Sequence, residues 1–251
     1  MTSPGVDLRD RRVLVTGGTR GIGAAIADTF EAAGAVVLVQ GTSPEEAATR
    51  NAAAATGQSR REYLHADFAD GVALQLFCED VRARHVDVLV NNAGVNRIRT
   101  LDALTAADYD WLMAIDLRAP LLLSQAVAAG MRERGWGRIV NVASIWSVIT
   151  KPGRAMYTAA KAGLAGLTRT LAVELAPSGV LVNTVSPGFT RTELTAATLS
   201  PQDAASLAGQ VPAGRFAEPA EIAQVVLFLA SPANTYLTGQ NIVVDGGFTC
   251  V

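Results

Sequence analysis

The sequence has little cysteine, and its cysteines form no pattern. Cys78 and Cys250 are the only two in a chain of 251 residues. Two thiols are too few for the disulfide framework of a small secreted domain, and their separation matches no metal-binding motif. We therefore expect no metal site, and we expect the chain to work in a reducing compartment, the cytoplasm.

Neither sign of charge dominates the chain. Lys and Arg number 21 and Asp and Glu number 23, which gives a formal net charge of −2. Because nucleic-acid-binding proteins carry a basic excess, we expect no nucleic-acid partner. Charged residues make up 18% and hydrophobic residues 49% of the chain, a balance that excludes a long disordered protein. Lysine itself is rare, and Lys151 and Lys161 are the only two.

Long apolar runs are also scarce. No run in the sequence approaches the roughly 18 residues that a membrane-spanning helix needs. The segment Met1–Arg12 is polar and lacks the apolar core of a signal peptide. These features predict no membrane partner.

Short β-branched runs alternate with Ala-rich stretches of helical spacing along the whole chain. Apolar strands separated by helices predict an α/β fold: a single Rossmann-type, doubly wound parallel sheet of about seven strands with helices on both faces. Such a sheet binds ligands outside the carboxyl ends of its strands, so the residues there form the candidate site. The predicted strands are Arg12–Thr16, Ala35–Val39, Tyr63–His65, Val86–Asn91, Arg138–Ala143, Val180–Val185 and Asn241–Asp245. The predicted helices are Gly21–Ala33, Pro44–Ala55, Gly71–Arg84, Ala106–Arg134, Ala155–Ala176 and Glu218–Ala230.

A glycine-rich turn follows the first predicted strand. Glycine permits a tight turn and a close approach of the backbone, and the free N–H groups at a helix start attract a pyrophosphate. The glycine spacing differs from the usual dinucleotide fingerprint, and a purely structural turn is the alternative interpretation. The position after the first strand of a parallel sheet favours a cofactor-binding turn. Its candidate cofactor residues are Gly17, Thr19, Arg20, Gly21, Ile22 and Gly23.

The ends of the next two strands bear on the choice of cofactor. An acidic residue after the second strand would bind the ribose 2′-hydroxyl of NAD and repel the 2′-phosphate of NADP. No carboxylate occurs there before Glu45, and Arg20 could pair with a 2′-phosphate, so the sequence favours NADP(H) and leaves NAD(H) open. A solvated role for Arg20 is the alternative. The further candidates are Thr42, Asp67 as an adenine contact or, equally, a helix cap, and Phe68.

Three residues with complementary chemistry follow the later strands. Ser144 stands after the fifth predicted strand, Tyr157 lies thirteen residues further, and Lys161 lies four residues after Tyr157. Positions i and i+4 share one helix face, so Tyr157 and Lys161 would point together. Tyrosine can protonate the alkoxide that hydride transfer to a ketone leaves, and an ammonium and an oxidised nicotinamide should lower its pKa from about 10 toward neutrality. The Ser144 hydroxyl would hydrogen-bond the substrate oxygen.

Together these motifs resemble the short-chain dehydrogenase/reductase family over essentially the whole chain. The resemblance implies that Tyr157 is the acid/base, that Lys161 lowers its pKa and holds the nicotinamide ribose, and that Ser144 orients the substrate carbonyl. It also implies cofactor contacts at Asn91, Ala93 and Gly94 on the adenosine side and at Pro187, Gly188, Thr190 and Thr192 at the nicotinamide end. The shared motifs are Thr16-Gly17-x3-Gly21-Ile22-Gly23, Asn91-Asn92-Ala93-Gly94, Ser144, Tyr157-x3-Lys161, Asn183, Pro187-Gly188 and Asp245-Gly246-Gly247.

One position departs from the family pattern. The family usually has an Asn within an Asn-Leu pair on the long helix after the fourth strand, whereas this chain has Asp116-Leu117. In the family that residue kinks the helix, and its backbone carbonyl holds a water bound to the lysine; Asp116 can still offer that carbonyl. A charge on Asp116 would partly offset the Lys161 ammonium, so we expect an active enzyme with an altered pH profile and count Asp116 among the catalytic candidates.

Within the family, three segments resemble the bacterial 3-oxoacyl-(acyl-carrier-protein) reductases: 17–23, 210–215 and 236–239. That group docks its acidic carrier on basic residues, and the corresponding places here hold Gly135 and Ser178. A free small-molecule substrate is therefore at least as well supported. The candidate substrate pocket consists of Asn96, Ile145, Trp146, Arg154 and Phe189, with a substrate lid around 189–215.

The sequence thus predicts one domain, residues 1–251, that interconverts a ketone and a secondary alcohol with NADP(H). One alternative is an NAD-dependent sugar, polyol or other secondary-alcohol dehydrogenase. Another, from a different class, is a non-catalytic dinucleotide-binding regulatory protein, for which Asp116 is the sole support. The resemblance implies a homotetramer or dimer that uses the two long helices and the C-terminal strand as interfaces.

Overall fold

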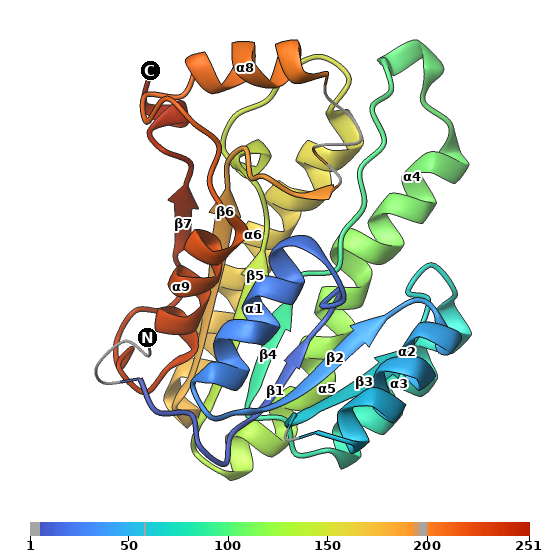
Figure 1. The fold of residues 1–251 in the computed structure, drawn as a ribbon, viewed down its shortest axis with the longest axis vertical. Coiled ribbons are helices and arrows are strands. Elements are labelled where there is room, and N and C mark those ends of the chain that lie inside the picture. Colours follow the sequence, from blue (N-terminus) through green and yellow to red (C-terminus); the bar gives the residue numbers. More distant parts are fainter. Residues whose placement is uncertain (1–5, 58, 194, 196–199) are drawn as a thin grey trace.

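A seven-stranded parallel sheet organises the chain (Figure 1). The computed structural model describes residues 6–57, 59–193, 195 and 200–251. The sheet order is β3-β2-β1-β4-β5-β6-β7, with a crossover between its two halves at β1 and β4. This confirms the predicted doubly wound α/β fold. The strands are β1 (Arg12–Val15), β2 (Val36–Gly41), β3 (Arg61–His65), β4 (Val88–Asn91), β5 (Gly137–Val142), β6 (Val180–Pro187) and β7 (Asn241–Val244).

Helices cover both faces of the sheet (Figure 1). On one face lie α1 and α9, with α2 beside β3; on the other lie α3, α5 and α6. The helices are α1 (Gly21–Ala32), α2 (Pro44–Ala55), α3 (Gly71–Ala83), α4 (Ala106–Met113), α5 (Ala119–Glu133), α6 (Ala155–Leu175), α8 (Pro201–Gly209) and α9 (Pro219–Ala230). Short turns of other helix types are η1 (Leu101–Ala103), η2 (Ala114–Arg118), η3 (Ile145–Ser147), η4 (Ala176–Ser178) and η5 (Phe248–Cys250).

The central strands are apolar on both faces because helices cover both. In β1, Val13 and Val15 belong to the core under α1 and α9, and Leu14 belongs to the opposite core. All three side chains are completely buried. Successive side chains of a strand point to opposite faces of the sheet. Because helices cover both faces here, every position must be apolar, which explains the continuous apolar runs in the sequence.

The long predicted helix 106–134 is interrupted at its centre. Residues Ala114–Arg118 form a π-helical turn, η2, between α4 and α5, and Asp116 lies in its middle. Pro120 follows in the first turn of α5, where its missing N–H costs least. Single π turns inside helices re-aim side chains and often occur at functional sites. The turn therefore sets the direction of the Asp116 side chain.

The helical stretch through η2 is the longest apolar one among the described residues. Ala106–Glu133 is long and apolar enough, by length and composition, to cross a membrane, although polar residues such as Asp116 and Ser124 interrupt it. However, 56% of its most apolar window is buried inside the fold. The stretch is apolar because it packs on the sheet and on α3 and α6, as the core helix of a globular domain does.

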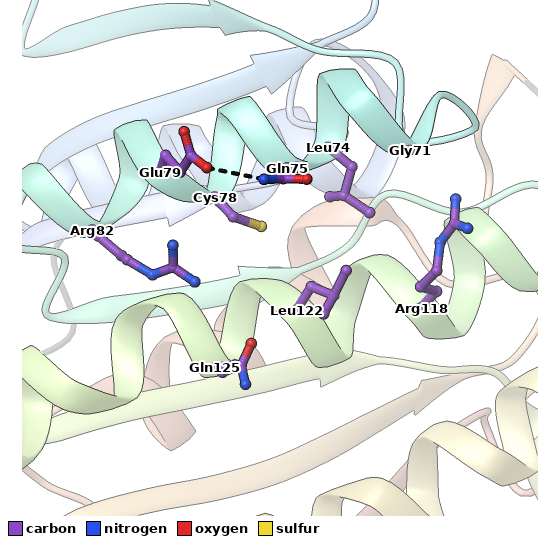
Figure 2. A pocket seen from close by; sticks show the side chains of 9 residues that line it. All are labelled: Gly71, Leu74, Gln75, Cys78, Glu79, Arg82, Arg118, Leu122 and Gln125. Atoms are coloured by element: carbon purple, nitrogen blue, oxygen red, sulfur yellow. Dashed lines mark hydrogen bonds between the residues drawn. The ribbon is translucent and has the colours of Figure 1, made fainter.

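A pocket of about 350 Å³ lies between α3 and α5 (Figure 2). Its lining includes Cys78, and Gln75 donates a hydrogen bond to Glu79 at its rim. Burial raises the pKa of the Cys78 thiol, so this cysteine stays a neutral core group. None of the predicted site residues lines this pocket. The chemistry must therefore be sought at the strand ends.

Candidate active site

The glycine-rich turn has the shape of a phosphate cradle. Gly17 and Gly21 have φ of 59° and 55°, in the left-handed region that favours glycine. A Cβ at Gly17 would lie 2.8 Å from the Cα of Ala93, and one at Gly23 would lie 2.2 Å from the Gly17 carbonyl oxygen. The first turn of α1 contains no acidic side chain, and its N-cap Arg20 makes no side-chain cap. Its N–H groups are therefore suited to an anion.

Side chains from three strand ends hold this turn in place: Thr16 and Asn92, which belong to the shared motifs, and Gln40, which the sequence did not single out. The Asn92 amide donates to the carbonyls of Thr16 and Gly17, both at 3.0 Å. The hydroxyl of Thr16 accepts the N–H groups of Asn92 and Ala93, and the Gln40 side chain accepts the Gly17 N–H at 2.9 Å. These bonds tie the ends of β2 and β4 to the turn after β1. The sequence shows each residue but not that they converge.

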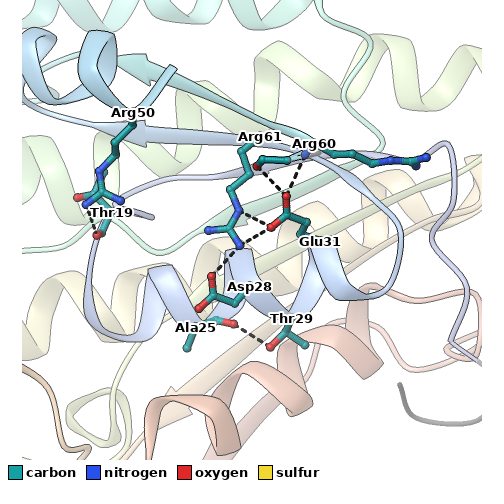
Figure 3. A network of polar contacts seen from close by, with 9 residues as sticks. Thr19, Ala25, Asp28, Thr29, Glu31, Arg50, Arg60 and Arg61 are labelled. Carbon is teal, nitrogen blue, oxygen red and sulfur yellow. Dashed lines mark hydrogen bonds and ion pairs between the residues drawn. The ribbon is translucent and has the colours of Figure 1, made fainter. Parts of the chain in front are cut away.

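The end of β2 lies against the glycine-rich turn. A Cβ at Gly41 would lie 2.8 Å from Thr19 Cγ2. From α2, Arg50 donates to the Thr19 carbonyl at 3.3 Å (Figure 3) and forms an ion pair with Glu46. Arg20 follows Thr19 and is exposed. Arg50 is thus a second cation near Arg20, which sequence reasoning missed because it lies one helix further along the chain.

The other adenosine-side candidates differ in their freedom to touch a cofactor. Thr42 and Asp67 are exposed after β2 and β3. Asp67 accepts the N–H two residues further on, whereas the N-cap of α3 is Asp70, so Asp67 does not cap that helix. Phe68 is 3% exposed and belongs to the core. Its side chain packs against Phe77 on α3.

Asn91 belongs to a buried polar chain that crosses the sheet. Its amide donates to Asn141 at 2.8 Å, and Asn141 donates to Thr168, whose hydroxyl shares a hydrogen bond with Thr184. Buried polar groups need such partners. The side chain of Asn91 therefore steadies β4, β5, β6 and α6. Ala93 and Gly94, two and three residues on, lie against Gly17 and against Lys161.

The nicotinamide-end candidates form a segment that crosses back toward the glycine-rich turn. Gly188 follows β6, and a Cβ there would lie 2.7 Å from the Asp245 side chain. Thr190 is buried. A Cβ at Gly21 would lie 3.5 Å from Thr192 Cγ2. The fold thus brings residues 21 and 192 to one site.

Ser144, Tyr157 and Lys161 meet at the carboxyl end of β5. Ser144 follows β5, accepts the Trp146 N–H at 3.4 Å and hydrogen-bonds Tyr157. Tyr157 and Lys161 both project from α6, and Lys161 Nζ lies 5.5 Å from the centroid of the Tyr157 ring. Lys161 is 3% exposed and donates to the Val142 carbonyl at 3.2 Å. The structure brings together the three residues that the sequence predicted.

Asp116 completes this group as a buried ion-pair partner. Its Oδ2 lies 3.1 Å from Lys161 Nζ, and its Oδ1 accepts the Val95 N–H at 2.8 Å. The Asp116 side chain is completely buried. A Cβ at Gly94 would lie 3.2 Å from Lys161 Nζ and 3.4 Å from Asp116 Oδ2. The glycine therefore leaves the ion pair its space.

The protein's own groups act on the pKa of Tyr157 in opposite directions. Burial raises the pKa of Tyr157, the Lys161 charge lowers it as expected, and Asp116 raises it further. The hydrogen bond with Ser144 and the charge of Arg154 also act downward, and the net shift from these groups is upward. The expected fall toward neutrality also relies on an oxidised nicotinamide, so it stays a prediction for the protein with its cofactor.

The lysine beside the phenol keeps its charge. Burial disfavours the ammonium of Lys161, but the charges of Asp116 and Tyr157 outweigh burial and raise its pKa. Burial raises the pKa of Asp116, and Lys161 opposes that shift. The buried charges therefore depend on each other, and removing either would leave the other unpaired.

The predicted substrate-side residues adjoin Ser144 and Tyr157 in the structure. Ile145 and Trp146 are 1% and 7% exposed and form η3. Arg154 is the N-cap of α6, and its guanidinium carbon lies 5.3 Å from the centroid of the Trp146 ring. These contacts place Arg154 at the same strand end as the reacting groups.

Two further substrate candidates lie on the loops around this end. Asn96 is exposed in the loop after β4. The ring of Phe189 stacks on that of Phe216, with 5.4 Å between centroids, and packs at 5.1 Å between centroids in a T-shaped contact with Phe248. These contacts tie the start of the predicted lid to the residue that follows its end and to η5. The lid contains α8, a helix that was not among the predicted ones. Lid residues 194 and 196–199 lie outside the described residues.

The fold and the site define a nucleotide-binding α/β oxidoreductase. Residues 17–249 match the family model described as Enoyl-(Acyl carrier protein) reductase. The chain belongs to the short-chain dehydrogenase/reductase family, whose members are oxidoreductases that act on CH–OH groups with NAD(P). This confirms the family resemblance.

The similar proteins differ in their named substrates. The 3-oxoacyl-[acyl-carrier-protein] reductase of Aquifex aeolicus is 38% identical, over 96% of this chain and 98% of its own length. The D-threitol dehydrogenase of Mycolicibacterium smegmatis is 37% identical, over 94% of this chain and 92% of its own length. The structure of a gluconate 5-dehydrogenase from Burkholderia cenocepacia in complex with NADP and tartrate is 33% identical, with a TM-score of 0.91, covering 98% of this chain and 97% of that one.

Proposed function

We propose that this chain is an NADP(H)-dependent oxidoreductase that interconverts a ketone and a secondary alcohol on a small molecule, with Tyr157 as the acid/base. The observation that carries the proposal is the meeting of Ser144, Tyr157 and a buried, charged Lys161 at the carboxyl end of β5. A ligand-binding strand end, a proton donor and a cation beside it are what carbonyl reduction needs.

The residues around the glycine-rich turn fit a dinucleotide. The turn is too crowded for a Cβ at Gly17 or Gly23, and the start of α1 has no side-chain cap. Gly21 and Thr192 would hold the cofactor from its two sides, and Lys161 would hold the nicotinamide ribose. The reduced nicotinamide would supply a hydride to the substrate's carbonyl carbon.

The chain's own side chains manage the proton. Ser144 Oγ donates a hydrogen bond to the carbonyl oxygen, which stabilises the negative charge that develops there. Tyr157 Oη gives that oxygen its proton during reduction and takes it back during alcohol oxidation. The Lys161 ammonium stabilises the resulting phenolate. Asp116 holds Lys161 and weakens this effect by its own charge.

Replacing Tyr157 tests the mechanism. We expect Tyr157→Phe to lower kcat for ketone reduction by about 10³-fold, because the proton donor is lost. NADPH binding, followed by its fluorescence, should stay within about threefold, since the glycine-rich turn is untouched. Retained turnover would overturn the mechanism. If neither the natural protein nor Tyr157→Phe turns over any ketone or alcohol of a panel, a non-catalytic dinucleotide-binding protein is favoured.

The preference for NADP(H) rests on the residues around the adenosine side. No carboxylate follows β2 before Glu45, and Arg20 lies exposed in the glycine-rich turn. Two of the similar structures contain bound NADP. We expect kcat/KM to favour NADPH over NADH, and Arg20→Ala to reduce that ratio about tenfold or more because a charge-assisted hydrogen bond is lost. A natural protein that prefers NADH would contradict the assignment.

A sugar or polyol substrate is the second candidate. It is supported by the similarity to a D-threitol dehydrogenase. An acyl carrier protein is less well supported, because this chain has Gly135 and Ser178 where the carrier would need basic docking residues. A panel with sugar alcohols, sugar acids and simple ketones, followed by NADPH absorbance, distinguishes these classes. We propose that the chain acts as one domain in the cytoplasm, which the free thiols Cys78 and Cys250 suit.

We also propose a homo-oligomer built on the outer face of α4, α5 and α6. A groove of about 750 Å³ runs along this face. Leu121 is 43% exposed at the groove, and Val173 on α6 is 78% exposed. Covering such an apolar face would remove it from water. The groove is lined by Asp110, Met113, Ala114, Leu117, Arg118, Leu121, Gly163 and Leu167.

A further inference from the structure

Two cations without an acidic partner, Arg154 and Lys151, lie by the Trp146 ring in the segment that leads into α6. Arg154 immediately precedes α6, and Lys151 lies in the loop before it. Within the described residues, neither forms an ion pair. The Nε of Arg154 is buried and has no hydrogen-bond partner there. Because buried polar atoms are nearly always bonded, this N–H lacks a group that a ligand would supply.

The buried indole of Trp146 fixes both cations. The guanidinium carbon of Arg154 and Nζ of Lys151 each lie 5.3 Å from the centroid of the Trp146 ring. A cation near an aromatic face is attracted by the ring's quadrupole. The backbone N–H of Trp146 donates to Ser144 Oγ at 3.4 Å. The two cations therefore lie on the ring of a residue whose backbone holds the hydroxyl that would orient the substrate.

Arg154 also lies close to the proton donor. It stands one helical turn before Tyr157, and its charge acts on the Tyr157 phenol. Burial disfavours the charge of Arg154, and burial together with Arg154 disfavours the charge of Lys151, which lowers the pKa of each. An anion placed between them and Tyr157 would offset these costs.

Two buried carboxylates near this end of the sheet are already engaged. Asp108 pairs with Arg97 and Arg99 in the neighbouring loop. Asp116 pairs with Lys161 under the phenol. The Arg99 N–H is donated to the Gly153 carbonyl, which ties that loop to the one that carries Lys151. The uncompensated positive charge among the described residues here is therefore that of Arg154 and Lys151.

We propose that Arg154 selects an anionic substrate: a hydroxy or oxo carboxylic acid whose carboxylate binds the guanidinium while its reacting carbon faces Ser144 and Tyr157. This rests on the proposed oxidoreductase function. A guanidinium offers a carboxylate two parallel N–H donors, which fixes the orientation of the substrate. The exposed Lys151 adds attraction toward the same anion without that geometry. A neutral ketone would leave the buried Nε of Arg154 unpaired.

The test uses matched substrates. Oxo carboxylates of three to six carbons are each compared with their own methyl esters, which carry the same carbonyl and no charge. We expect the natural protein to favour the acids in kcat/KM. Arg154→Gln should lower kcat/KM for the acids by about 10- to 100-fold, mainly through KM, because a charge-assisted hydrogen bond is lost. The readout is the ratio of kcat/KM for each acid to that for its own ester, because the influence of Arg154 on the Tyr157 phenol acts on both substrates alike.

A second measurement separates binding from turnover. Calorimetric titration with tartrate should show binding to the natural protein with cofactor and about tenfold or weaker binding to Arg154→Gln. Arg169→Gln, on the exposed side of the same helix, serves as the matched control and should change neither measurement. Equal kcat/KM for acids and esters would overturn the inference, and so would the absence of turnover or binding of any acid. In both cases, turnover of the esters would still support the proposed function. Failure to turn over any substrate would instead overturn the proposed function.

Discussion

At the scale of single residues, the unusual feature is a carboxylate where the family usually has an amide. Asp116 is completely buried and lies 3.1 Å from the Lys161 ammonium. An amide could occupy the same space without charge. The carboxylate raises the pKa of both Lys161 and Tyr157. The buried charge of Asp116 therefore acts on the proposed proton donor from within the protein.

Removing that charge should shift the pH dependence of the reaction. The proposed mechanism requires a deprotonated Tyr157 in alcohol oxidation, and Asp116 raises the Tyr157 pKa. We expect Asp116→Asn to move the corresponding limb of the kcat/KM profile to lower pH by about one unit. The measurement is the pH profile of alcohol oxidation in both proteins.

The matched control is a carboxylate at the other end of the sheet. Asp87, at the amino end of β4, accepts the Arg12 N–H and is remote from the strand ends that carry the site. Asp87→Asn should leave the position of the limb unchanged. A limb that stays in place in Asp116→Asn would show that the charge of Asp116 does not tune the phenol.

The residue scale also shows which site residues a sequence can reveal. Tyr157 and Lys161 are four positions apart on one helix, so their shared face follows from helix geometry. Thr16, Gln40 and Asn92 come from three different strand ends, and their contacts depend on the order of the strands. The spacing of residues in the chain could not reveal them.

At the scale of elements, a polar cluster joins α1 to β3 (Figure 3). Glu31 on α1 lies 2.7 Å from Arg61 on β3, and it accepts the Arg60 N–H and the Ser59 hydroxyl. Arg61 also pairs with Asp28. Burial opposes the charge of Glu31, but these hydrogen bonds and the Arg61 charge outweigh burial and lower its pKa. The cluster fastens the edge strand to the fold.

The pKa shift makes this contribution to stability depend on pH. Because the folded-state pKa of Glu31 is lowered, its contribution is present above the ordinary carboxyl pKa and is lost as pH falls through the folded value. We expect Glu31→Gln to lower the free energy of unfolding by about 1–2 kcal/mol at pH 7. The difference should shrink below about pH 4. Urea unfolding at several pH values measures it.

Glu79 offers a matched surface carboxylate. It is exposed on α3 and accepts only a side-chain hydrogen bond from Gln75 among the contacts found in the described residues. Glu79→Gln should change the free energy of unfolding by less than about 0.5 kcal/mol. An equal effect of both substitutions would show that the cluster adds nothing beyond an ordinary surface charge.

The interruption of the long helix shows what element prediction misses. The apolar spacing of 106–134 predicts one helix, and the structure has α4, η2 and α5. A π turn widens one turn of the helix without changing its apolar composition, so the sequence pattern does not reveal it. It is stabilised here by the contacts of Asp116 with Val95 and Lys161, which are distant in the chain.

At the scale of the whole molecule, the proposed interface of a homo-oligomer is the outer face of α4, α5 and α6. We expect Leu121→Asp to shift the proposed oligomer toward the 26.1 kDa chain, because a charge would be buried in the apolar contact. Light scattering after size-exclusion chromatography measures the mass. Val72→Asp, at a 69% exposed position on α3, should leave the mass unchanged. An unaltered mass in Leu121→Asp would place the interface elsewhere.

The sequence by itself determined the alternation of strands and helices, the ligand-binding edge and the pairing of Tyr157 with Lys161. These follow from local periodicity and from the general rule for parallel sheets. Only the tertiary structure decided which strand ends meet, how Asp116 faces Lys161, and that Arg154 lies by Trp146 without an acidic partner. It also decided the direction of the Tyr157 pKa, because burial depends on residues far apart in the chain and outweighs the charge of one neighbouring lysine.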